Sequence, residues 1–215
     1  AVRLMATDQQ QPPKPAAGKC ARRHVSEALL PTNGDELPYT PRVWNETVTR
    51  RSHNCFSYAL NMVEPKSRQL CRRRVAAGKP TCRSIWPQPH TPEELRDRRH
   101  ERFQCNLMHP VLVEQLRHRG FHAVARRAAC PAGFYKVGLS VASGDNYHWF
   151  RQDADGWWSH KDGGLPTSRV DASNNPIRDP SRCDRKYSNI HYDAWCGFYC
   201  VRNQSEVERA WDRLN

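Results

Sequence analysis

Long apolar runs and metal-binding cysteine patterns are both missing from this sequence of 215 residues. No stretch approaches the roughly 20 apolar residues that cross a bilayer, so we expect no transmembrane segment. No Cys-x-x-Cys pair and no Cys/His group at zinc spacing occurs, and nothing else indicates a metal ion or a cofactor.

Acidic residues are scarce relative to basic ones. The chain has 34 Lys and Arg against 22 Asp and Glu, a formal net charge of +12 and a pI near 9.6. Such a surface attracts polyanions, including nucleic acid, acidic glycans, anionic lipid headgroups and bacterial wall polymers. The arginines are spread along the sequence rather than grouped on one recognisable helix, so solubility alone explains the charge equally well.

Cysteine is abundant. The nine cysteines are Cys20, Cys55, Cys71, Cys82, Cys105, Cys130, Cys183, Cys196 and Cys200. Without zinc spacing they predict a disulfide framework, and with it a secreted or periplasmic location. The start at Ala1 agrees with a mature chain that has lost its leader. An odd number leaves one sulfur unpaired, so we expect one free thiol, while the pairing of the other eight stays open.

The apolar pattern predicts a tail followed by one folded domain. Residues 1–19 are a polar tail rich in Pro and Gln, and residues 20–215 form a single domain with a basic, cysteine-bearing insert at about 66–90. We expect helices at 54–63, 91–103 and 110–120, a short closing helix from Ser205, and strands at 121–125, 137–141, 147–151, 157–160 and 195–201. A helix first and an antiparallel sheet afterwards is an α+β layout.

Cys55 is the best-placed nucleophile among the thiols. It lies where the predicted helix 54–63 begins, and a helix N-terminus lowers the pKa of a thiol and offers free backbone N–H groups. The N–H of Cys55 would stabilise an oxyanion, with Asn54 or His53 as a candidate second donor. The alternative is that Cys55 is simply another half-cystine. The odd cysteine count favours the catalytic interpretation.

His148 and His160 lie on the two strands of a predicted hairpin. If the loop is Ala154-Asp155-Gly156, with its glycine left-handed, His148 lies opposite Asp162 and His160 is its diagonal neighbour on the same face. A two-residue turn would instead place His148 on the other face. We expect His148 to be the base, within hydrogen-bond reach of the Cys55 sulfur, and His160, or else Asp162, to orient it.

These residues resemble a known family. The order Cys55, His148 and His160, with a helix before a sheet, is similar to the papain-like cysteine hydrolases, and most similar to their NlpC/P60 branch, whose third residue is commonly a histidine one short hairpin further on. The strings from Asn54 to Ala59 and from His148 to Lys161 also resemble uncharacterised secreted bacterial proteins.

The resemblance implies a fold and a reaction. It implies that residues 20–215 are one disulfide-stabilised catalytic domain of papain-like α+β fold, with the cysteine-bearing helix packed on an antiparallel sheet. It also implies hydrolysis of an amide bond, in a peptide, a cell-wall peptide or a glutamine side chain, by a Cys-His-His thiolate mechanism.

Two other functions are compatible with the sequence. A secreted basic ribonuclease could use the same two histidines with Lys161 and would need no thiol. A non-catalytic binding or effector module could present Trp149, Trp157 and Trp158 to a glycan or a partner, although ordinary hairpin packing explains the same tryptophans.

Overall fold

The computed structural model describes residues 28–89 and 103–203. The predicted tail at 1–19, nearly all of the predicted helix 91–103 and the closing helix predicted from Ser205 lie outside the described residues. In the part of the chain that the structure describes, no helix combines the length and the apolar character needed to cross a membrane.

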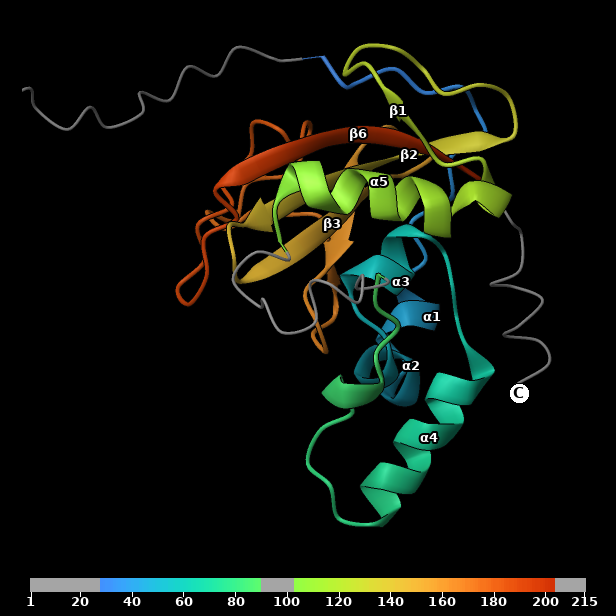
Figure 1. Ribbon diagram of the computed structural model, residues 1–215, viewed down its shortest axis with the longest axis vertical. Coiled ribbons are helices and arrows are strands. Elements are labelled where there is room, and N and C mark those ends of the chain that lie inside the picture. Colours follow the sequence, from blue (N-terminus) through green and yellow to red (C-terminus); the bar gives the residue numbers. More distant parts are fainter. Residues whose placement is uncertain (1–27, 90–102, 204–215) are drawn as a thin grey trace, which may run out of the picture.

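A six-stranded antiparallel sheet forms the centre of the protein, in the order β1-β6-β2-β3-β4-β5 (Figure 1). The strands are β1 (His122–Val124), β2 (Phe134–Ala142), β3 (Asn146–Gln152), β4 (Trp158–Lys161), β5 (Thr167–Ser168) and β6 (Ala194–Arg202). Because β2 lies between β6 and β3 and both of its faces are covered, all of it after Phe134 is buried. The α+β layout with an antiparallel sheet is confirmed.

The helices precede and accompany the sheet. They are α1 (Pro41–Asn45), α2 (Thr47–Ser52), α3 (Cys55–Ala59), α4 (Pro65–Ala76) and α5 (Cys105–Gln115), with 3-10 turns η1 (Arg83–Ile85) and η4 (Arg117–Arg119). The main core lies between α3, α5 and one face of the sheet, where Phe56 and Leu112 join Val137 and Trp149. On the opposite face, Phe150 and Trp158 pack in a second cluster.

Three helices differ from the sequence prediction. The predicted helix 54–63 ends at Ala59, because Asn61 takes a left-handed φ of 52°. Pro65 does not simply follow that helix but starts α4, where its missing N–H costs nothing at the first helical position. The insert predicted at about 66–90, for which no helix was expected, therefore contains nearly all of a 12-residue helix. Helix α5 begins at Cys105, five residues earlier than predicted, and contains Pro110 in its interior.

The predicted hairpin register is confirmed. Strand β3 pairs with β4 so that Phe150 lies opposite His160, which places the three-residue loop at 154–156. The N–H of Asp153 donates to the carbonyl of Trp157 at 2.8 Å, and Gly156 has a φ of +81°. Glycine adopts this left-handed conformation without the steric cost of a side chain.

Three disulfides join described cysteines. Cys105–Cys196 ties α5 to β6, and Cys130–Cys200 ties the loop after β1 to the same strand. Cys71–Cys82 closes the insert, linking α4 to the residue before η1. The first two bridges cross-link distant parts of the chain, and Cys105–Cys196 fixes α5 against β6.

Candidate functional site

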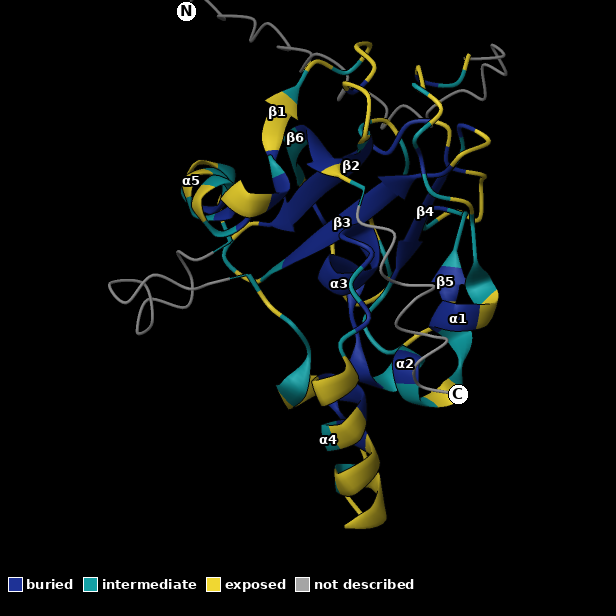
Figure 2. Ribbon diagram, turned by 90° about the vertical axis from the view of Figure 1, so that its right-hand side faces the viewer, coloured by how far each residue is buried: buried dark blue, intermediate teal, exposed yellow. Residues whose placement is uncertain are grey.

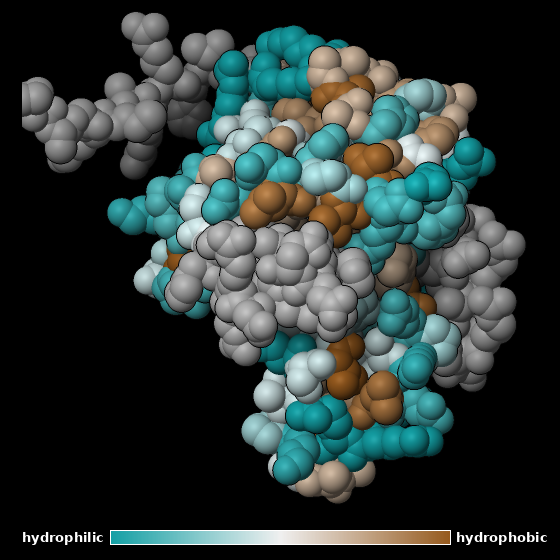
Figure 3. Space-filling view, in the orientation of Figure 1, coloured by the Kyte–Doolittle hydropathy of each residue, from teal (hydrophilic) through white to brown (hydrophobic). Residues whose placement is uncertain are grey.

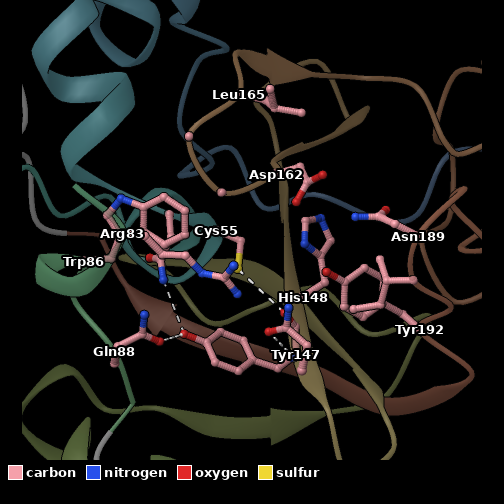
Figure 4. A pocket seen from close by; sticks show the side chains of 15 residues that line it. Cys55, Arg83, Trp86, Gln88, Tyr147, His148, Asp162, Leu165, Asn189 and Tyr192 are labelled. Carbon is pink, nitrogen blue, oxygen red and sulfur yellow. Dashed lines mark hydrogen bonds between the residues drawn. The ribbon is translucent and has the colours of Figure 1, made fainter. Parts of the chain in front are cut away.

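Cys55 and His148 line one pocket of about 300 Å³. The pocket lies between the start of α3, the segment around η1 and the loop that follows β4. Figure 4 shows Arg83, Trp86 and Gln88 on the Cys55 side of this pocket. Asp162 and Tyr192 lie on the His148 side in the same view. The fold therefore brings together two of the three residues predicted from the sequence as a catalytic group, and places them on one cavity.

Cys55 occupies the first position of α3. The side chain of Asn54 caps this helix by accepting a hydrogen bond from the N–H of Ser57 at 3.2 Å. Strand β4 pairs with β3 only at residues 150–152. The start of α3 lies beside the first half of β3, with which β4 does not pair. The Cys55 sulfur lies 4.0 Å from the carbonyl oxygen of Tyr147 there. The thiol thus contacts the backbone of the strand that carries His148.

The thiol is protonated in this arrangement. Only 6% of Cys55 is exposed, and burial raises the pKa of its thiol to about 12. Within the described residues, the Cys55 sulfur forms its hydrogen bond with Tyr147 and none with His148. The expected Cys55–His148 hydrogen bond is therefore absent, because a buried neutral thiol directs its proton to the nearby backbone carbonyl. The expectation that the helix start lowers the pKa of this thiol was wrong, since burial outweighs a helix of five residues.

His148 and His160 are joined by a hydrogen bond whose direction can be assigned. Nε2 of His148 lies 2.8 Å from Nδ1 of His160, and Nε2 of His160 lies 2.9 Å from the carbonyl oxygen of Val170. A carbonyl can only accept, so Nε2 of His160 carries a proton and Nδ1 of the neutral ring accepts one from His148. His148 then carries its proton on Nε2. Its Nδ1 is left with a free lone pair, which is the form that a general base requires.

Burial keeps both histidines neutral. It lowers the pKa of His148 well below the usual value, with the neighbouring His160 as a second cause, and it also lowers the pKa of His160. The hydrogen bond with Val170 and the charge of Asp162 raise the pKa of His160, but burial outweighs them. In the described part of the chain the Asp162 carboxylate forms no hydrogen bond with either ring. His160, rather than Asp162, is thus the residue in contact with His148.

The sequence did not single out Tyr147 or Gln88, which complete the Cys55 side of the pocket. The Tyr147 hydroxyl accepts a hydrogen bond from Nδ2 of Asn54 at 3.3 Å and donates to Oε1 of Gln88 (Figure 4). This bond fixes the Gln88 amide with its NH₂ group away from Tyr147. No sequence signal could have found Gln88, because it follows the insert, whose position in the fold the sequence does not specify.

The two candidate second oxyanion donors differ in availability. Nδ2 of Asn54 donates one of its two N–H groups to Tyr147, and the second N–H remains. His53 is fully buried, and its Nε2 accepts from the N–H of Glu64 at 2.8 Å while its Nδ1 lies 2.8 Å from the Ser52 hydroxyl. The NH₂ group of Gln88 and the guanidinium of Arg83 are further side-chain donors on this side of the pocket.

Lys161 does not join the two histidines. Strand alternation directs it to the opposite face of β4 from His160, and its Nζ donates to the carbonyls of Arg50 at 2.8 Å and His53 at 2.7 Å. It also donates to the carbonyl of Gly163. Burial lowers the pKa of Lys161 to about 7, so its charged form depends on these three acceptors. By binding these carbonyls, Lys161 holds the segment before Cys55 in place, and we call this role a structural clamp. This geometry gives no support to a His-His-Lys ribonuclease site.

Two of the three hairpin tryptophans are core residues. Trp149 and Trp158 are fully buried, one in each apolar cluster. Trp157 is partly exposed and lies under the guanidinium of Arg178, 4.8 Å from its ring centre. The three side chains do not form a common surface for a glycan.

The structure also bears on the free thiol. Among the described cysteines, Cys55 and Cys183 are not in disulfides, and Cys20 lies outside the described residues. A single free thiol on Cys55 would therefore require Cys183 to pair with Cys20.

We expect that pairing, and hence one reactive thiol per chain. Unfolding the unreduced protein in guanidinium with a maleimide, followed by intact mass and peptide mapping, should show one label, on Cys55. Label on Cys183, or three labels, would show that the predicted fourth bridge does not form.

Comparisons with known proteins add one relationship. The chain matches no family model, and no solved structure matches it. It is 28% identical over 162 residues to insoluble matrix shell protein 1 of Ruditapes philippinarum, an alignment that covers 74% of this chain and 88% of that protein. The match is to a protein whose name describes a component of a shell matrix.

Proposed function

We propose that this protein is a secreted cysteine hydrolase that cleaves an amide bond, with Cys55 as nucleophile, His148 as general base and His160 as its orienting partner. The hydrogen-bonded chain from the Val170 carbonyl through both histidines carries the proposal, because it leaves a free lone pair on Nδ1 of His148, a residue that shares its pocket with a thiol. The arrangement of a helix-borne cysteine and a strand-borne histidine is also the one that the papain-like and NlpC/P60 resemblance implies.

The reaction begins with proton transfer. When a substrate carbonyl enters the pocket, Nδ1 of His148 takes the thiol proton as the Cys55 sulfur attacks the carbonyl carbon. The resulting imidazolium is stabilised by its hydrogen bond to His160. Collapse of the tetrahedral intermediate breaks the C–N bond, His148 returns the proton to the leaving amine, and a thioester remains. Water, deprotonated by His148, then releases the acid and restores the thiol.

Two donors suit the oxyanion. The N–H of Cys55 belongs to the first turn of α3, where backbone N–H groups have no helical acceptor. The NH₂ group of Gln88 is the second donor, held by the hydrogen bond from the Tyr147 hydroxyl. Removing one such donor in other hydrolases costs roughly 10² to 10³ in rate.

Acylation by a generic ester tests the nucleophile directly. With p-nitrophenyl acetate we expect a burst of p-nitrophenol and an acetyl group on the Cys55 peptide that hydroxylamine removes. Cys183→Ser serves as the matched control, since Cys183 is the other described cysteine outside a disulfide and does not line the pocket. Acetyl groups on Cys183, or no burst from a folded protein, would contradict the proposed nucleophile.

A structural matrix role is the second candidate, favoured by the similarity to the shell matrix protein over 88% of its length. This similarity and the three disulfides also support an extracellular location for the present chain. A purely structural protein would show no burst, and the acylation experiment therefore separates the two candidates.

A further inference from the structure

A basic projection lies beside the pocket. Residues 65–83, here called the basic arm, comprise α4, the turn after it and the return to Arg83. The arm extends away from the sheet, and most of α4 is exposed (Figures 1 and 2). Hydrophilic residues cover most of its visible surface (Figure 3). In α4 only Ser67, Arg68 and Cys71 are buried, so the arm adds little to the core.

The charge of the basic arm is of one sign. It carries seven Lys and Arg residues and no Asp or Glu: Lys66, Arg68, Arg72, Arg73, Arg74, Lys79 and Arg83. Arg68 is buried and pairs with Glu46 at 3.4 Å, whereas the other six are exposed or partly exposed. Most arginines are spread along the sequence, as expected, but α4 groups Arg68, Arg72, Arg73 and Arg74 on one helix that the sequence did not predict.

Like charges at this density repel, so the arm is held by other means. The Cys71–Cys82 disulfide joins α4 to the returning segment. Nε of Arg74 donates to the carbonyl of Thr81 at 3.2 Å, and Arg51 donates to the carbonyl of Pro80 at 3.0 Å. The basic arm therefore concentrates positive charge, is held by a disulfide and hydrogen bonds, and contributes little to the core. This combination is typical of a docking surface for an anionic partner.

Arg83 connects this surface to the pocket. It is exposed and lines the cavity that contains Cys55, and its side chain points into the pocket in Figure 4. Within the described residues its guanidinium has no hydrogen-bond or ion-pair partner. An unpaired guanidinium on the wall of a reactive pocket is suited to bind a carboxylate of the substrate.

We infer that the substrate is an acidic polypeptide, which the basic arm docks and whose carboxylate Arg83 holds next to the scissile amide. The choice of a polypeptide rests on the proposed amide hydrolysis. Nucleic acids have no backbone amide for a thiol to attack, whereas an acidic polypeptide has both negative charge and backbone amides. The arm and the pocket then recognise one continuous ligand.

Binding tests the arm without reference to catalysis. The full chain is titrated with poly-L-glutamate, with single-stranded DNA and heparin measured at the same ionic strength. Arg72→Gln/Arg73→Gln should weaken poly-L-glutamate binding about tenfold. Arg127→Gln/Lys186→Gln removes the same charge from exposed sites elsewhere and should change it less than about twofold. Equal losses in the two variants, or tighter binding of DNA or heparin than of poly-L-glutamate, would overturn the inference.

A second readout concerns Arg83. The wild-type protein should be acylated faster by mono-p-nitrophenyl glutarate, which carries a carboxylate, than by p-nitrophenyl acetate, and Arg83→Gln should reduce this preference about tenfold. An unchanged preference, with Cys55 still acylated, would refute the inference and leave the proposed function intact. Loss of poly-L-glutamate binding in the arm variant without any acylation of the wild type would support docking and refute the hydrolase.

Discussion

Replacing Cys55 or His148 with alanine is expected to lower the acylation rate at least about a thousandfold, and combining the two changes should cost little more than either alone. The thiol and the base act as a unit, because a thiol with a pKa near 12 attacks only if Nδ1 of His148 removes its proton. The measurement is the burst rate with p-nitrophenyl acetate for both single variants and the double variant.

Graded variants test the orienting group. His148→Gln keeps a donor toward His160 and serves as the folding control for the alanine variant. His160→Ala should leave measurable activity, since it removes the partner of the base and not the base itself, and Asp162→Asn should cost less still. A larger loss in the Asp162 variant than in the His160 variant would assign the orienting role to Asp162. A fully active Cys55→Ala protein would refute the mechanism.

The hairpin was predictable because its register depends on local chemistry. A glycine at the third position of the loop accepts the left-handed conformation, and once the loop length is fixed, strand alternation decides which side chains share a face. His148 and His160 follow directly from this. The strands β2 and β6 were likewise visible as short apolar runs, because β2 is buried after Phe134 and β6 is buried from Phe198 to Val201. The edge strand β1 was also predicted, although its side chains are exposed or half-buried.

The surroundings of Cys55 were not predictable in the same way. The pKa of a thiol at a helix start depends on how deeply the fold buries it, and burial comes from contacts with β3 and with residues distant in the sequence. Helix α4 was not predicted because its sequence has no apolar periodicity. The helix makes few apolar contacts with the core, and a disulfide holds it instead. Gln88 reaches the pocket only through that insert.

Lys161→Met is expected to lower the free energy of unfolding by about 3–5 kcal/mol. The change keeps most of the side-chain volume but leaves the carbonyls of Arg50, His53 and Gly163 without their shared donor in a buried site. Because two of these carbonyls lie just before Cys55, the variant should also loosen the start of α3 against β4. Urea unfolding followed by tryptophan fluorescence measures the stability.

The matched control is Lys186→Met, an exposed lysine for which we expect a change of less than about 0.5 kcal/mol. The experiment also distinguishes two roles for Lys161. A structural clamp predicts a large loss of stability, whereas a catalytic cation, as in the ribonuclease alternative, would be replaceable without much change in unfolding. Unaltered stability of Lys161→Met would therefore contradict the clamp and return Lys161 to consideration as a reacting group.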